Sequence, residues 1–118
     1  MGVAAIAISG LLAGCGQMVS ARVIEGPASI ATVVERTDPR MGEETEGVPG
    51  ASVRVLTTNG GVLASGTTDE LGRIKMGLPR NYRGRIRIEA TADGYQLTRS
   101  DMYVPSESSR VLVVMPKR

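Results

Sequence analysis

Apolar and polar residues alternate along much of the second half of the chain. Ala51, Val53 and Val55 are separated by Ser52 and Arg54. Strict alternation of this kind predicts a β-strand with one buried face, because successive side chains of a strand point to opposite sides. The sequence therefore indicates a sheet whose apolar side faces a core and whose basic side faces water.

Similar apolar stretches recur at steady intervals, separated by turn signals. These signals include an Asn-Gly pair at Asn59 and a DELG turn that runs from Asp69 to Gly72; both compositions favour tight turns. Strands are expected at residues 28–36, 50–57, 62–68, 73–78, 85–92, 95–104 and 110–116. Seven short strands with regular turns, and no competing amphipathic helix, predict an all-β sandwich.

Three segments lie outside this pattern. Residues 1–14 are interpreted as a signal peptide, and residues 15–27, which are polar and mixed, as the mature N-terminus and a tether. Residues 37–47, TDPRMGEETEG, are acidic and turn-rich without periodicity, which predicts an exposed loop. The remaining chain, residues 28–118, forms one β-domain in this interpretation.

Composition narrows the possible chemistry. The 118 residues include no His, Trp or Phe and a single Cys, and the formal net charge is +2. Without histidine the chain lacks the usual general base and the commonest metal ligand, and one cysteine cannot form an internal disulfide. The weak positive charge does not indicate nucleic-acid binding. We therefore expect no cofactor, no metal and no nucleic-acid partner.

An uncharged apolar run of about a dozen residues precedes the only cysteine. It is shorter than the roughly 20 residues that a helix needs to cross a bilayer, but it has the length of the apolar region of a secretory signal. It carries no Lys or Arg before it, although most export signals do. The four residues LAGC, 12–15, resemble the lipobox of bacterial lipoproteins.

This resemblance implies that the Cys15 thiol is diacylated and that the bond between Gly14 and Cys15 is then cut. Two or three acyl chains, such as palmitate, give a stable anchor in a lipid bilayer. The residue after the cysteine is Gly16 rather than Asp, which in that family favours the outer membrane; we expect the domain on its periplasmic face. The alternative is that Cys15 is a buried structural residue.

A second resemblance extends from residue 30 to the C-terminus. The residues that carry it are Gly47, Pro49, Ala51, Val53, Thr68, Asp69, Gly72, Gly77, Leu78, Pro79, Gly94 and Tyr95. In this order they resemble the carboxypeptidase regulatory-like domain. That resemblance implies a seven-stranded prealbumin-like (transthyretin-like) β-sandwich and a non-enzymatic role as a folding, spacing or interaction module.

Ordinary turn chemistry gives some of these residues a structural role. Asp69 is expected to accept hydrogen bonds from following backbone N–H groups, and Gly72 to adopt a positive φ. Tyr95 is expected to bury its ring while its hydroxyl finds a backbone partner. Tyr103 is likewise expected at a core or corner position.

Two other kinds of site are weaker hypotheses. NYRGR, residues 81–85, is similar to the Tyr-Arg-Gly signature of hydroxyisourate hydrolases, but that signature works with histidines and this chain has none. The acidic residues Asp38, Glu43, Glu44 and Glu46 could bind calcium, but they lack the alternating ligand spacing of a calcium loop. A solvated charge run is the preferred interpretation.

The alternation places several cationic residues on outward faces. The candidate partner-binding residues are Arg54, Arg73, Lys75, Arg85, Arg87 and Tyr82. If their strands are neighbours, they form a basic face for an acidic protein or anionic lipid; a soluble sandwich also uses such residues simply to keep its surface wet. We expect a lipid-anchored structural or adaptor protein with an envelope protein as partner. The alternative is a carrier for a small ligand, sugar or peptide.

Overall fold

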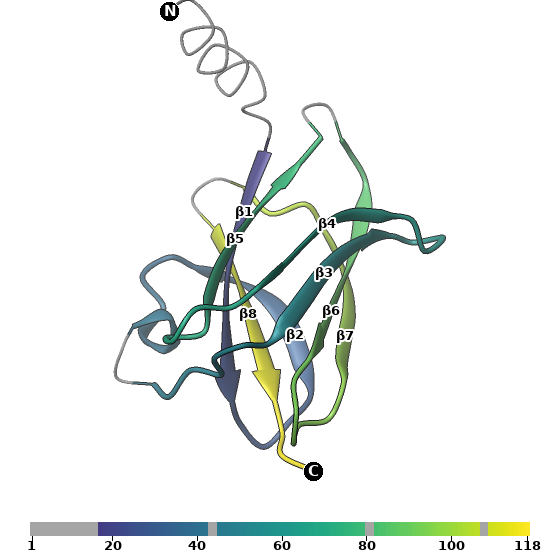
Figure 1. Ribbon diagram of the computed structural model, residues 1–118. Helices are drawn as coiled ribbons and strands as arrows, with labels where there is room; N and C mark the ends of the chain where they lie inside the picture. Colours follow the sequence, from purple (N-terminus) through teal and green to yellow (C-terminus); the bar gives the residue numbers. More distant parts are fainter. Residues whose placement is uncertain (1–16, 43–44, 80–81, 107–108) are drawn as a thin grey trace, which may run out of the picture.

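The computed structural model describes residues 17–42, 45–79, 82–106 and 109–118, and it is all-β (Figure 1). The motif around Cys15 lies outside these residues. The strands are β1 (Gln17–Glu25), β2 (Ile30–Glu35), β3 (Ser52–Thr57), β4 (Val62–Thr67), β5 (Arg73–Leu78), β6 (Arg85–Thr91), β7 (Thr98–Tyr103) and β8 (Ser109–Met115). A single 3-10 turn, η1 (Pro39–Met41), lies between β2 and β3.

The strands form two four-stranded sheets. Sheet A has the order β2-β8-β1-β5, and sheet B has the order β4-β3-β6-β7. β1 and β8, at the centre of sheet A, are parallel, and all the other neighbouring strands are antiparallel. Each sheet thus combines strands that are distant in the sequence, which decides which side chains share a face.

The core lies between the two sheets and consists mainly of valine, isoleucine and alanine. The inward positions predicted for β3 are confirmed, because Ala51, Val53 and Val55 are fully buried. Those predicted for β6 are also confirmed, and the largest inward residues, Ile86 and Ile88, have no exposed surface. Small and β-branched side chains fill this core without any large aromatic ring, apart from partly buried tyrosines at its rim.

All seven expected strands are present, but the tether predicted for residues 15–27 is wrong. Gln17–Glu25 is strand β1, bonded to β5 on one side and β8 on the other. Its residues Val19, Ala21 and Val23 alternate and are buried in the core. The described part of the chain therefore has eight strands rather than seven, and β1 is a central strand.

The acidic segment 37–47 is also more than an exposed loop. Asp38 caps η1 by accepting a hydrogen bond from the Arg40 N–H. Met41 packs on a second apolar cluster, formed by Ile24, Leu112 and Val114 on the side of sheet A that faces away from sheet B. The segment therefore covers part of the outer face of sheet A.

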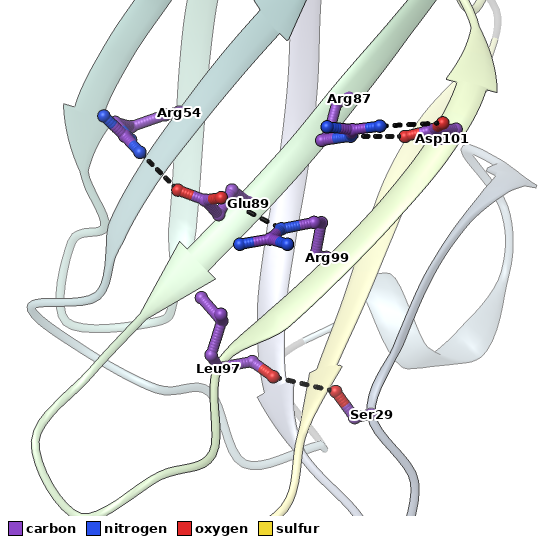
Figure 2. Close-up of polar contacts among 7 residues, drawn as sticks. All are labelled: Ser29, Arg54, Arg87, Glu89, Leu97, Arg99 and Asp101. Atoms are coloured by element: carbon purple, nitrogen blue, oxygen red, sulfur yellow. Dashed lines mark hydrogen bonds and ion pairs between the residues drawn. The ribbon is translucent and has the colours of Figure 1, made fainter. Parts of the chain in front are cut away.

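The edge strands β2 and β7 join the two sheets by side-chain hydrogen bonds. The Ser29 Oγ lies 3.1 Å from the Leu97 carbonyl oxygen and 2.9 Å from the Thr98 Oγ1, and the Ala31 N–H donates to the Ser100 Oγ at 3.1 Å. Figure 2 shows the Ser29–Leu97 contact. These bonds cover one open edge of the sandwich, where unpaired backbone would otherwise invite association.

Candidate functional site

The basic face that these residues would form if their strands were neighbours is divided by the fold between two sheets. Arg54, Arg85 and Arg87 lie on β3 and β6 of sheet B, whereas Arg73 and Lys75 lie on β5 of sheet A. β5 pairs with β1 and not with β6, so the condition that these strands be neighbours is met only within sheet B, for β3 and β6. The two groups must therefore be considered as separate surfaces.

The outer face of sheet B carries a lattice of ion pairs (Figure 2). Glu89 on β6 bridges Arg54 on β3 and Arg99 on β7, with an Arg99 Nε to Glu89 Oε2 distance of 3.1 Å. One step along the same strands, Arg87 contacts Asp101 through two bonds of 2.7 and 3.3 Å. Arg54 and Arg87 are therefore already paired with carboxylates on the same face.

Both carboxylates of this lattice are stabilised in their charged form. The hydrogen bond from the Arg54 guanidinium lowers the pKa of Glu89 below its ordinary value, with a further contribution from Arg99. The pKa of Asp101 is lowered by its hydrogen bond from Arg87. The lattice is therefore ionised near neutral pH, and its charged side chains are paired with one another.

Arg85 and Tyr103 form an exposed pair at one end of this face. The two residues are direct partners on β6 and β7, and the Arg85 guanidinium carbon lies 5.8 Å from the centre of the Tyr103 ring. Tyr103 is 70% exposed, so its predicted core or corner position is wrong: its register puts it on the outer face. Tyr82 contributes differently, because its hydroxyl donates to the Arg85 carbonyl oxygen at 2.9 Å and its ring packs against the core.

The other group of predicted cations lines a cleft on sheet A. This basic cleft has a volume of about 590 Å³. It is lined by Ser20, Ala21, Arg36, Thr37, Met41, Asp69, Arg73, Ile74, Lys75 and Arg110. Four cationic side chains thus converge against one carboxylate.

Arg22 is the one charged residue that is fully buried in the part of the chain that the structure describes, and no sequence pattern had singled it out. Its guanidinium donates to four carbonyl oxygens. The acceptors belong to Leu71, Arg40, Gly42 and Thr45. Arg22 therefore clamps the segment 40–45 and the β4–β5 turn to the outer face of sheet A, beside the basic cleft.

The turn predicted at Asp69 is confirmed. Its Oδ1 accepts hydrogen bonds of 2.9 Å from the backbone N–H groups of Leu71 and Arg73, and Gly72 has a φ of +79°. The backbone hydrogen bond from Arg73 lowers the pKa of Asp69. The backbone partner expected for Tyr95 is wrong, because its hydroxyl donates to the Glu25 carboxylate at 3.0 Å; this bond raises the pKa of Tyr95.

Glu43 and Glu44, the centre of the suggested calcium site, lie outside the described residues. Asp38 forms an ion pair with Arg40 at 3.0 Å instead. Across residues 17–42, 45–79, 82–106 and 109–118 there is no group of three or more carboxylate, cysteine or histidine side chains placed to hold a metal ion. Within the same residues no helix is long and apolar enough to cross a membrane.

Comparison with known proteins gives no family for this chain. No protein-family model matches the sequence, and no curated protein matches it. The resemblances to bacterial lipoproteins and to the carboxypeptidase regulatory-like domain therefore remain hypotheses. A function can be inferred only from the surfaces of the two sheets.

Proposed function

We propose that this chain is a non-enzymatic, lipid-anchored protein of the bacterial outer membrane that acts as an adaptor for an envelope protein. The anchor would be the acylated Cys15, and the body a prealbumin-like sandwich extended by strand β1. Because β1 begins at Gln17, this arrangement would hold the sandwich within two residues of the lipid.

One observation carries the adaptor function: the exposed Arg85–Tyr103 pair stands on a face whose other charges are already ordered. Tyrosine and arginine are the side chains most enriched at the energetic centres of protein interfaces. The neighbouring ion pairs Arg87–Asp101 and Arg99–Glu89 hold their side chains in place, so a partner would lose less side-chain entropy on docking.

The test is purification of the tagged chain from solubilised envelopes. Arg85→Glu and Tyr103→Ala should each reduce the amount of the co-purified envelope protein about tenfold or more. Lys75→Glu is the matched control, because it reverses an exposed charge on the other sheet. Arg87→Glu is a poor test, since it would place a second carboxylate beside Asp101. Retention of the same protein by both the Arg85 and the Tyr103 variants would contradict the proposal.

The anchor has its own test. Mass spectrometry of the N-terminal peptide should find a diacylated cysteine as the first residue, and Cys15→Ser should leave the chain uncleaved and unacylated. A Cys15→Ser chain that is still processed and still fractionates with the outer membrane would contradict the lipid anchor. It would leave the adaptor face to be judged separately.

A second candidate function, a binding module for a small ligand, is favoured by the basic cleft. Its volume of about 590 Å³ is within the range of small-molecule pockets, roughly 300 to 1,000 Å³. The cleft and the Arg85–Tyr103 pair lie on different sheets, so the two functions do not compete for one surface.

A further inference from the structure

We infer that the basic cleft binds the phosphate group of a small phosphorylated compound or of a lipid headgroup. This inference rests on the second candidate function, which it deepens by naming the ligand chemistry, and it is independent of the partner face on sheet B.

Ser20 occupies the floor of the cleft between two long cationic side chains. Ser20 on β1 pairs directly with Lys75 on β5. On its other side, Arg110 on β8 comes one residue before the Ala21–Val111 pair. Since neighbouring strands are about 4.8 Å apart, the backbones that carry Lys75 and Arg110 are separated by roughly 10 Å. Lys75 and Arg110, whose guanidinium also donates to the Ser109 carbonyl oxygen at 2.9 Å, therefore stand on either side of the small serine.

Two further cations complete the cleft. Arg73 is two residues from Lys75 on the same strand, about 7 Å away along the chain, and it faces the same side because its partner, Arg22, follows Ser20 by two residues. Arg36 comes directly after β2, at the other edge of sheet A. The positive charges thus reach the cleft from three different segments rather than from one strand.

This arrangement favours phosphate over carboxylate. A phosphate monoester carries close to two negative charges and three terminal oxygens, so it can accept hydrogen bonds from donors on several sides at once. A carboxylate has two oxygens in one plane and is best matched by a single planar guanidinium. Lysine, arginine and a serine hydroxyl around one point are donors that suit a phosphate.

The rest of the lining accommodates the remainder of such a ligand. Asp69 is the one carboxylate, and its Oδ1 is engaged by two backbone N–H groups. Met41 lines the cleft and belongs to the segment that Arg22 clamps through the carbonyl groups of residues 40 and 42. The wall is therefore fixed by a buried side chain, so the cleft is formed before a ligand arrives, which lowers the entropic cost of binding.

The experiment is a titration of the purified full chain with glycerol 3-phosphate, followed by the amide resonances of the protein. We expect shifts centred on Ser20, Lys75 and Thr37, and little change at Tyr103. The double variant Arg73→Gln/Lys75→Gln should weaken binding about tenfold or more. The control, Arg83→Gln/Lys117→Gln, removes the same charge from exposed residues outside the cleft and should bind as the unaltered chain does.

A second arm distinguishes the source of the phosphate. The chain is mixed with vesicles of phosphatidylcholine alone or with added phosphatidic acid, the lipid whose headgroup is a phosphate monoester. Binding of glycerol 3-phosphate supports a soluble ligand, whereas shifts at Ser20 and Lys75 with the phosphatidic acid vesicles alone support a lipid headgroup. The inference is overturned if neither probe shifts these amides, or if the cleft double variant and the control lose binding equally. A failure of the adaptor test at Arg85 changes neither result.

Discussion

The outer faces of the two sheets are built on opposite plans. On sheet A, the described residues of the segment 37–47 (37–42 and 45–47) lie against the strands and are held by the buried Arg22. On sheet B, the strands are bare and their charges pair with one another at the surface, as between Arg87 and Asp101. The first face stores stability in buried polar bonds and shapes a cleft, whereas the second contributes little stability and stays available for contact.

The largest expected effect is that of Arg22→Met. Methionine keeps the apolar stem but leaves four part-buried carbonyl acceptors without their guanidinium donor. We expect the free energy of unfolding to fall by about 3 kcal/mol or more, as measured by urea denaturation. The matched variant Arg54→Met on sheet B should cost less than about 1 kcal/mol. Equal losses for the two arginines would break the contrast between the faces.

The next largest effect is expected at Gly72, in the β4–β5 turn, where the Leu71 carbonyl oxygen accepts a hydrogen bond from Arg22. A Cβ at Gly72 would lie 2.3 Å from the Val23 carbonyl oxygen, and the φ there is +79°. Gly72→Ala should therefore lower the free energy of unfolding by about 2 to 3 kcal/mol. Gly94, with a φ of +83° and open space around its Cβ position, is the control, and Gly94→Ala should cost only about 1 kcal/mol. Thermal unfolding of the two variants tests this difference. If both variants lose the same stability, the positive φ alone explains the loss at Gly72, and the close packing there contributes nothing.

A smaller effect is expected at Thr68, whose side chain bonds the backbone at Val48 and Ala51, just after the segment 37–47. Its buried hydroxyl donates to the Val48 carbonyl oxygen at 2.7 Å and accepts from the Ala51 N–H at 2.9 Å. Thr68→Val, which keeps the shape, should lower the free energy of unfolding by about 1 to 2 kcal/mol. The adjacent exposed Thr67→Val should have little effect in the same denaturation experiment. A loss at Thr67 as large as that at Thr68 would contradict this assignment.

The smallest effect is expected on sheet B. Because its hydrogen bond from Arg54 lowers the folded-state pKa of Glu89 below 4.5, the carboxylate stabilises the fold above that value, and the contribution is lost as the pH falls through the folded pKa. Glu89→Gln should cost at most about 1 kcal/mol at neutral pH and nothing once the carboxylate is protonated. Denaturation at neutral and acidic pH, with and without high salt, measures this; a difference that persists in acid would contradict it.

Local patterns predicted most of the fold, and the failures have a common physical cause. The alternation in β3, β5 and β6 and the Asp69 turn depend on residues a few positions apart, and each was predicted correctly. Strand β1 also alternates, but its polar, mixed composition favoured a tether. The burial of Arg22 depends on carbonyl groups 18 to 49 residues away, and no local pattern contains them.

The candidate surfaces were harder to predict than the strands. The outward direction of Arg73, Lys75 and Arg87 follows from alternation and is correct. Their division follows from strand order, because β5 crosses to sheet A beside β1 while β3 and β6 stay together in sheet B. Arg36 and Arg110 join the basic cleft only through that order. The acidic partners of Arg54 and Arg87 were present in the sequence, but only the β3–β6 register places Glu89 opposite Arg54, and only the β6–β7 register places Asp101 opposite Arg87.

The most direct test of the division between the two faces is photo-cross-linking in living cells, with a photoreactive amino acid at position 103 or at position 75. The account predicts an envelope protein captured from position 103, lost when Arg85→Glu is added, and no protein captured from position 75. Capture of a protein from position 75, with none from position 103, would contradict it.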